Sequence, residues 1–304
     1  MERTLKKKIV VIGAVNMDIG GTPREALIDR DSNPGTVTLR PGGVGRNIAH
    51  DLCLLGAEVS LIAAVGGDVY GAAILESCRS IGIDMSMSLV LPERRSSTYL
   101  YVNDASGDMH IAISDMEIAL CVTPEYLAPL MEEINRADAV VLDANLTAET
   151  IAFVCEHCTV PVYADPVSTV KAEKLRPVLH RLFCLKPNAI EAEKLSGESE
   201  PARAAAALNA LVVNRVYISC GGDGMYAAEE GKLLRLPAER INVVNTTGAG
   251  DAATAAIVFA GVNGLGLEEA AALGMKAGAL TCTCVEANNP ELASLSEGLG
   301  STGV

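Results

Sequence analysis

The sequence contains no tryptophan and few other aromatic residues, namely seven tyrosines and three phenylalanines. It has only four histidines. Basic residues are also scarce, because 24 lysines and arginines stand against 38 aspartates and glutamates and give a formal net charge of −14. No basic block follows residues 6–8. Proteins that bind nucleic acid neutralise its phosphates with clustered basic side chains, so we expect no nucleic-acid partner.

Long hydrophobic runs are missing as well. No apolar stretch is long enough to cross a bilayer, and residues 1–8 are charged, unlike the start of a signal peptide. We therefore expect a cytoplasmic protein that does not contact a membrane. The nine cysteines are scattered, which is typical of reduced and mostly buried thiols. Cys155 and Cys158 lack a second pair at zinc-site spacing, and we interpret them as structural.

The hydrophobic content of 49% in 304 residues is enough for a large core. Short apolar segments alternate with segments of helical periodicity, which predicts one α/β domain with a mostly parallel sheet covered on both faces. The predicted strands are 8–13, 59–64, 85–90, 139–142, 160–163, 182–185, 216–219 and 241–244. The predicted helices are 48–55, 68–80, 124–135, 147–156, 170–179, 189–195 and 249–261.

Two segments interrupt this alternation. Residues 19–40 are polar and rich in turn formers, and residues 97–102 and 109–113 have the pattern of a β-hairpin. We expect the regions 19–40 and 94–115 to form one small, discontinuous β lid over a cleft, within a single domain that spans 1–304. The alternative is two unrelated surface excursions.

One junction combines glycines with an acid. The β-branched run at 241–244 predicts a strand, and the Ala-rich run at 249–261 predicts a buried helix whose first turn includes the glycines of 248–250. The first N–H groups of a helix lack partners and lie at the positive end of its dipole, so they attract an anion such as phosphate. Asp251 would lie beside that anion, a position that suits a base for a group attacking the phosphate.

Two other interpretations of this junction stay open on the pattern alone. A lone Gly-x-Gly often marks only the capped start of a closely packed helix. Residues 248–253 also match the G-x-G-x-x-A fingerprint of dinucleotide-binding folds, with Glu268 at a suitable distance. That fingerprint should be followed by a second strand carrying the acid, whereas residues 265–280 have helical spacing, so this interpretation is disfavoured.

Polar residues mark two further places in a cleft. Asn16 and Asp18 follow the first predicted strand, and a second glycine-rich loop at 41–47 leads into a helix. Asn188 and Glu191 follow a later strand and lie one helical turn apart. This pair could hold water around Mg²⁺ or form a capping box at the helix start, and the pattern alone favours the capping box.

These motifs together resemble a known family. Residues 41–49 resemble the first signature of the ribokinase (PfkB) carbohydrate kinases, residues 245–251 resemble the second, and the turn at 221–224 lies in the expected order. The resemblance implies a ribokinase-like three-layer α/β/α fold with a small β lid. It also implies transfer of the γ-phosphoryl group of ATP to a sugar hydroxyl, with Mg²⁺ as cofactor. The sequence has no P-loop, which agrees with phosphates held at a helix terminus.

The resemblance also implies roles for single residues. Asp251 would be the base, and the amides of Gly248, Ala249 and Gly250 would hold the transferred phosphate. The residues implied in sugar binding are Asn16, Asp18, Gly42, Gly43, Asn47 and Asn145, the last at a position where the family often has glutamate. The residues implied in ATP binding are Asn188, Glu191, Ser219, Gly221, Gly222, Gly224, Thr247 and Asn288, with Asn188 and Glu191 also contacting Mg²⁺ through water.

Three short stretches, 31–35, 112–116 and 288–292, are most similar to those of family members that phosphorylate pseudouridine, which implies its 5′-hydroxyl as acceptor. The alternatives are ribose, fructose or another nucleoside, or a sugar-binding regulator without catalysis. Asn245 stands where potassium-activated members commonly have aspartate, which weakens the case for K⁺, so a K⁺ requirement stays open. Unpaired lid edges imply a homodimer by analogy.

Overall fold

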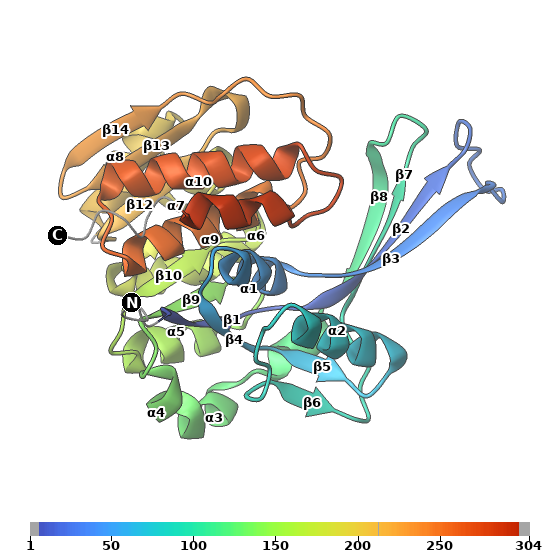
Figure 1. The fold of residues 1–304 in the computed structure, drawn as a ribbon, viewed down its shortest axis with the longest axis horizontal. Coiled ribbons are helices and arrows are strands. Elements are labelled where there is room, and N and C mark those ends of the chain that lie inside the picture. Colours follow the sequence, from blue (N-terminus) through green and yellow to red (C-terminus); the bar gives the residue numbers. More distant parts are fainter. Residues whose placement is uncertain (1–5, 212, 298–304) are drawn as a thin grey trace.

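The computed structural model describes residues 6–211 and 213–297, and the chain forms three layers around a central sheet (Figure 1). Eight strands form the sheet in the order β14-β13-β12-β11-β10-β9-β1-β4. The strands from β4 to β12 along this order pair in parallel. Strand β13 pairs antiparallel with both of its neighbours, β12 and β14. Their bounds are β1 (Lys8–Ile12), β4 (Glu58–Ile62), β9 (Ala139–Asp143), β10 (Val162–Asp165), β11 (Cys184–Leu185), β12 (Arg215–Ser219), β13 (Met225–Glu229) and β14 (Lys232–Leu236). The predicted fold class is confirmed.

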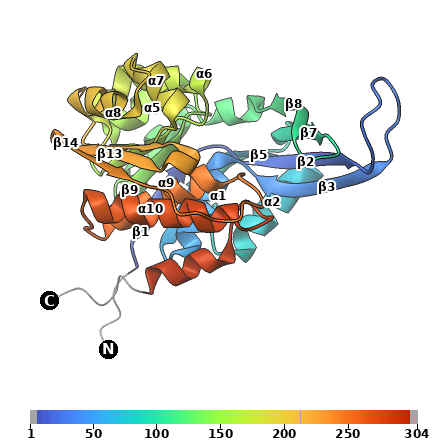
Figure 2. The ribbon, with the colours of Figure 1, turned by 90° about the horizontal axis from the view of Figure 1, so that it is seen from above.

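Successive side chains of β1 point to opposite faces of the central sheet, and both faces are buried under helices. Ile9 and Val11 are buried in one hydrophobic cluster, and Val10 and Ile12 are buried in a second cluster on the other face. The first face is covered by α1 (Val44–Leu54), α2 (Val69–Ser80), α9 (Ala249–Val262) and α10 (Leu267–Cys282). The second face is covered by α3 (Pro124–Leu127), α4 (Met131–Ile134), α5 (Ala148–His157), α6 (Thr169–Ala172), α7 (Ala189–Ser196) and α8 (Pro201–Ala210). Figure 2 shows β13 and β14 between helices of both groups.

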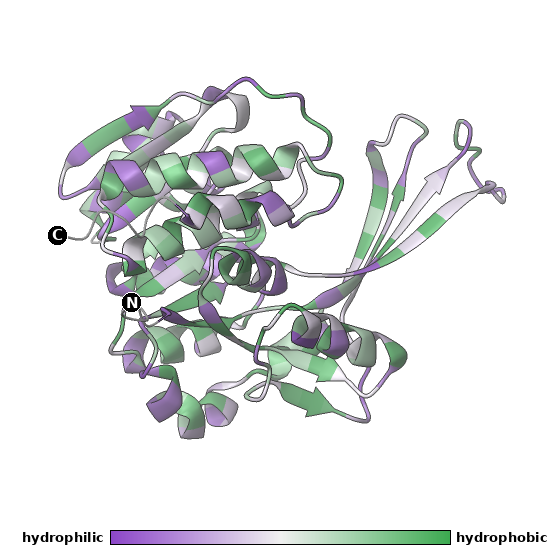
Figure 3. Cartoon of the chain, viewed as in Figure 1, coloured by the Kyte–Doolittle hydropathy of each residue, from purple (hydrophilic) through white to green (hydrophobic). Residues whose placement is uncertain are grey.

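A second sheet extends away from the layered body (Figure 1). Its order is β3-β2-β7-β8, and its strands are β2 (Asn16–Pro23), β3 (Gly35–Gly42), β7 (Thr98–Asn103) and β8 (Met109–Asp115). Strand β2 pairs in parallel with β7, so two segments that are distant in the sequence share one sheet. Hydrophobic residues occur along the strands of this sheet as well as in the body (Figure 3). A separate pair, β5 (Ala64–Gly66) and β6 (Leu89–Leu91), lies beside α2 in Figure 1.

Several predicted elements differ in the structure. Residues 241–244 form no strand, because the N–H of Val244 donates to the carbonyl of Cys282 at 2.8 Å instead of to a neighbouring strand. The predicted helix at 124–135 is broken by a 3₁₀ turn, Ala128–Leu130, that contains a proline. The predicted helix at 170–179 is only α6 followed by a 3₁₀ helix around Pro177.

Helix α8 was not predicted at all, although Pro201 at its first position and the alanines after it are typical of a helix start. Within the described residues, no helix is both long and apolar enough to cross a membrane. The charged residues 1–5 lie outside the described part of the chain.

Candidate active site

Helix α9 begins at the glycine-rich junction. Gly248 precedes it with φ of 82°, and a Cβ there would collide with the backbone of Ala287, so glycine is required. Across residues 6–211 and 213–297, the N–H groups of Gly248, Gly250 and Asp251 meet no protein acceptor. The N–H of Ala249 makes a long bond of 3.3 Å to the preceding turn. Three amides at the positive end of this helix are therefore available to an anion.

Asp251 lies in the first turn of α9, where its Oδ2 accepts a hydrogen bond from Asn47 Nδ2 at 2.8 Å. Burial raises the pKa of Asp251 to about 7, and the negative charges of Asp165 and Asp143 act in the same direction. The hydrogen bond from Asn47 and the positive charge of Lys186 oppose this shift. A general base works best when its pKa lies near the working pH, so the position and the environment of Asp251 suit a base.

A buried polar network supports this helix start. Lys186 Nζ donates to the carbonyl of Gly250 at 3.1 Å and lies 3.4 Å from Asp165 Oδ2. Thr254 Oγ1 donates to the same Asp165 oxygen at 2.8 Å. Lys186 was not among the predicted site residues, although its place directly after a strand and two residues before Asn188 could have indicated it.

A cavity of about 440 Å³ lies on the lid side of α9. Its wall includes residues from the lid sheet, from α1 and from the loops before α9 and after α10, among them Asp18, Gly42, Arg46, Asn47, Tyr101 and Asn288. Burial raises the pKa of Asp18, and the hydrogen bond from Asn16 Nδ2 lowers it. A Cβ on Gly43 would lie only 2.9 Å from Asn16 Oδ1, so this loop packs closely behind Asp18. Arg46 and Tyr101 were not among the predicted site residues.

A second cavity, of about 280 Å³, lies on the other side of the same helix start. Its wall includes Ser219, Gly221, Gly222, Gly224, Ala249 and Gly250, which are all predicted nucleotide or phosphate residues. Gly221 and Gly222 have open space where a Cβ would be. Asn47 lines the first cavity and donates a hydrogen bond to Asp251, and Gly250, the residue before Asp251, lines the second cavity. Asp251 therefore lies between the two cavities.

Asn188 and Glu191 form the capping box of α7. Asn188 Oδ1 accepts from the N–H of Glu191, and Glu191 Oε2 accepts from the N–H of Asn188, both at 2.9 Å. Burial raises the pKa of Glu191. Its second oxygen, Oε1, makes no hydrogen bond within the described residues. The capping role is therefore present, and it leaves one carboxylate oxygen for water or a cation.

Three predicted site residues lie away from their expected partners. Asn145 is 6% exposed and lines neither cavity, and its Oδ1 accepts from Lys171 Nζ. Asn288 and Thr247 line the cavity on the lid side, not the one on the far side of α9. Asn288 Nδ2 donates to the carbonyl of Asn47 at 3.1 Å, so Asn288 supports α1.

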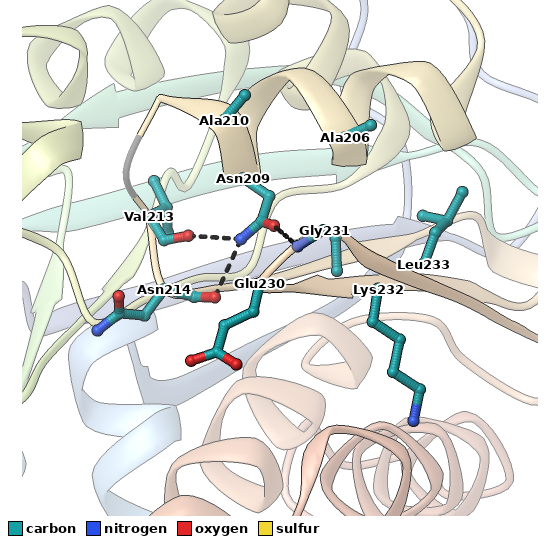
Figure 4. A pocket seen from close by; sticks show the side chains of 10 residues that line it. Ala206, Asn209, Ala210, Val213, Asn214, Glu230, Gly231, Lys232 and Leu233 are labelled. Atoms are coloured by element: carbon teal, nitrogen blue, oxygen red, sulfur yellow. Dashed lines mark hydrogen bonds between the residues drawn. The ribbon is translucent and has the colours of Figure 1, made fainter.

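A third hollow, of about 290 Å³, lies between α8 and the β13–β14 hairpin (Figure 4). Asn209 crosses it, and its Nδ2 donates to the carbonyls of Val213 and Asn214, while its Oδ1 accepts from the N–H of Gly231. Both the nitrogen and the oxygen of the Asn209 amide are therefore occupied, and they join α8 to the residues before β12 and to the turn of the hairpin. The hollow contains none of the predicted site residues.

Two cavities on either side of a helix N-terminus, with the half-buried carboxylate of Asp251 beside them, suit a phosphotransferase that binds a nucleotide and an alcohol acceptor. A model of the pfkB family carbohydrate kinases matches residues 6–293. The chain belongs to this family, and it is an ATP-dependent phosphotransferase with an alcohol group as acceptor.

Known relatives cover nearly the whole chain. The pseudouridine kinase of Escherichia coli (strain K12) is 39% identical over 294 residues, which are 94% of this chain and 94% of that protein. A carbohydrate kinase from Agrobacterium tumefaciens is 29% identical, with a TM-score of 0.84 and coverage of 96% of this chain and 97% of that one. The ribokinase of Arabidopsis thaliana complexed with ribose and ATP has a TM-score of 0.83 at 22% identity, covers 98% and 100% of the two chains, and shares the fold.

Proposed function

We propose that this enzyme transfers the γ-phosphoryl group of ATP to the 5′-hydroxyl of pseudouridine and releases pseudouridine 5′-phosphate and ADP. The observation that carries the proposal is the 39% identity, over 94% of the chain, to the pseudouridine kinase of Escherichia coli. The stretches 112–116 and 288–292 support it, because one lies at the end of lid strand β8 and the other begins with Asn288 in the lid-side cavity wall.

Asp251 takes the proton of the acceptor hydroxyl in this proposal. The hydroxyl oxygen forms a bond to the γ-phosphorus, the bond from that phosphorus to the bridging oxygen of ADP breaks, and ADP leaves with the electron pair. The unpaired amides of Gly248 and Gly250 donate to the oxygens of the migrating group. The raised pKa of Asp251, about 7, lets the carboxylate accept a proton near neutral pH.

The lid-side cavity is the proposed acceptor site. The carboxylate of Asp18 would accept hydrogen bonds from ribose hydroxyls, and charge-assisted bonds of this kind contribute about 1.5–3 kcal/mol each. Asn47 Oδ1 is buried without a partner in the described residues and is available to a sugar hydroxyl. Asn16, Gly42 and Gly43 shape the wall behind the sugar. Asn145 would act on the sugar only indirectly, since Lys171 already occupies its amide oxygen.

The cavity on the other side of α9 is the proposed nucleotide site, with Ser219 and the turn at 221–224 beside the adenosine. Among the described residues there is no cluster of three or more His, Cys, Asp or Glu that could hold a metal ion alone. This fits Mg²⁺ that arrives with ATP and keeps water ligands, as Mg²⁺ usually does. Glu191 and Asn188 would bind those waters, and the ion would neutralise phosphate charge.

A homodimer is also part of the proposal. The strand register places Val37, Leu39, Leu100, Ile111 and Ile113 on one face of the lid sheet, and they are 67%, 54%, 41%, 57% and 63% exposed. The opposite face carries cavity residues such as Asp18 and Tyr101. An apolar face of this size turned away from the site suits a second copy of the lid. A cytoplasmic location agrees with ATP as substrate and with nine free cysteines.

The experiment that tests the function is a phosphorylation panel with Mg-ATP. Pseudouridine, uridine, other nucleosides, ribose and fructose are compared by kcat/KM, with ADP release and product mass as readouts. The proposal expects the highest kcat/KM for pseudouridine and phosphate on its 5′-oxygen. A clear preference for another acceptor would reject the substrate. ATP turnover with none of them would favour a sugar-binding regulator without catalysis.

A further inference from the structure

A lysine ammonium lies beside the helix start where the phosphoryl group is expected. Lys186 is 5% exposed, and its Nζ donates to the carbonyl of Gly250 at 3.1 Å and lies 3.4 Å from Asp165 Oδ2. An ammonium carries three N–H donors. Since these are its two partners in residues 6–211 and 213–297, one N–H is left for a ligand.

The missing side chain of Gly250 leaves space directly in front of that ammonium. Apart from the adjoining residues and the backbone of α9 itself, a Cβ built on Gly250 would have one neighbour within 4 Å among the described residues, Lys186 Nζ at 3.2 Å. Gly250 also lines the nucleotide-side cavity, and its own N–H is unpaired within the described residues. A phosphate oxygen in this space would therefore reach both the ammonium and the amides at the start of α9.

The lysine is held in place from behind. Asp165 Oδ1 accepts from the N–H of Val167 at 2.9 Å, and Asp165 Oδ2 accepts from Thr254 Oγ1 at 2.8 Å. Thr254 Oγ1 also lies 3.0 Å from the carbonyl of Gly250. Because the bonds from Val167 and Thr254 fix the Asp165 carboxylate, and the carbonyl of Gly250 belongs to helix α9, both partners of the Lys186 ammonium are held in place, which is what electrostatic stabilisation of a reacting group requires.

We propose that Lys186 is a catalytic residue that donates its third N–H to an oxygen of the phosphoryl group during transfer. The inference rests on the proposed function and names a further group in that same site. Lys186 neither gains nor loses a proton, since the acceptor proton goes to Asp251 and the bridging electron pair goes to ADP. Its positive charge offsets the repulsion between the incoming phosphate and the carboxylates of Asp143, Asp165 and Asp251.

The test compares binding of MgADP with binding of MgADP plus aluminium fluoride and the preferred acceptor, a mimic of the transferring group. Lys186→Met alone would leave Asp165 buried without its cation and could unfold the protein. The main variant is therefore Lys186→Met/Asp165→Asn, and Asp165→Asn is its matched control. Lys174→Met is a second control, because Lys174 donates only to the carbonyls of Ala144 and Leu146.

We expect the double variant to bind MgADP with the same affinity as the Asp165→Asn control. Aluminium fluoride and the acceptor should increase that affinity by a factor that is roughly 10- to 100-fold smaller in the double variant than in the control. Its kcat, measured at alkaline pH where Asp251 is ionised, should fall by a similar factor, while Lys174→Met keeps both properties. If aluminium fluoride increases the MgADP affinity equally in the double variant and in Asp165→Asn, the role of Lys186 is overturned and the proposed function is not. A wild-type enzyme that phosphorylates no acceptor would overturn the proposed function and the inference together.

Discussion

Asn47 and Asp251 are 204 positions apart in the chain, and their side chains meet in a hydrogen bond of 2.8 Å. The contact joins α1, which lines the lid-side cavity, to the start of α9. Because Asn47 Nδ2 donates to Asp251 Oδ2, the other carboxylate oxygen is left for an acceptor hydroxyl. This contact supports the proposal that the two glycine-rich segments form one site, in which the first would present the alcohol and the second would hold the phosphate and the base.

Replacing the proposed base should separate chemistry from binding. Asp251→Asn keeps the size of the side chain but cannot take a proton, so kcat should fall by roughly 10²–10⁴ or more. The residues of the proposed nucleotide site, Ser219 and 221–224, are untouched, and calorimetry should give an ADP affinity close to that of the wild type. Near-normal turnover in this variant would rule out Asp251 as the base.

The acid limb of the pH profile should report the pKa of Asp251, which burial raises to about 7. Activity requires the carboxylate, so kcat/KM should fall as pH drops below this value. The hydrogen bond from Asn47 lowers the pKa, and Asn47→Ala should therefore move the acid limb to higher pH. Asn135→Ala, a change far from the site, serves as control. An unchanged limb in Asn47→Ala would contradict this coupling.

Much of this fold was predictable from the sequence, because each buried strand was marked by a short apolar run and most helices by their periodicity. The start of α9 was predicted closely, since the glycines at 248–250 separate an apolar run from an Ala-rich run of helical composition. Residues 241–244 show the limit. Their β-branched side chains gave a strand signal, but Ile241 and Val243 line the nucleotide-side cavity instead of joining a sheet.

The parts of the site that escaped prediction depend on tertiary contacts. Lys186 becomes important only because folding places its ammonium next to Gly250, 64 positions away. Arg46 lies in the glycine-rich segment at 41–47 and was given no role, yet it is 6% exposed and lines the lid-side cavity. Asn288 was assigned to ATP by resemblance, whereas its hydrogen bonds join it to α1. Sequence spacing carries no information about such contacts between distant segments.

Potassium should have little effect on this enzyme. Asn245 Nδ2 donates to the carbonyl of Val285 at 3.0 Å, and its Oδ1 accepts from the N–H of Thr247 at 3.0 Å, so the neutral side chain already ties these segments together. Turnover should be equal in potassium, sodium and choline buffers of the same ionic strength. Asn245→Asp adds a charge and should create a response to potassium. If potassium strongly raises the turnover of the wild type, the idea that the Asn245 side chain makes a bound cation unnecessary is wrong.

Removing the lid hairpin should open the acceptor site to water. Replacing residues 99–114 by two glycines deletes most of β7 and β8, including Tyr101 of the cavity wall. We expect a higher KM for the acceptor and faster ATP hydrolysis without acceptor, because a closed lid excludes water. Tyr101→Ala should raise KM without the increase in hydrolysis. A deletion that changes neither quantity would contradict the function of these strands as a lid.

The apolar face of the lid should hold two copies of the chain together. Ile113→Glu puts a charge on that face, next to Leu100 in the strand register, and burying an unpaired carboxylate against another lid would be costly. Light scattering should therefore show a dimer for the wild type and a monomer for Ile113→Glu. His110→Glu changes the opposite face of β8 and should leave the dimer intact. A monomeric wild type would contradict the proposed dimer, and an Ile113→Glu variant that stays dimeric would place the interface away from this face.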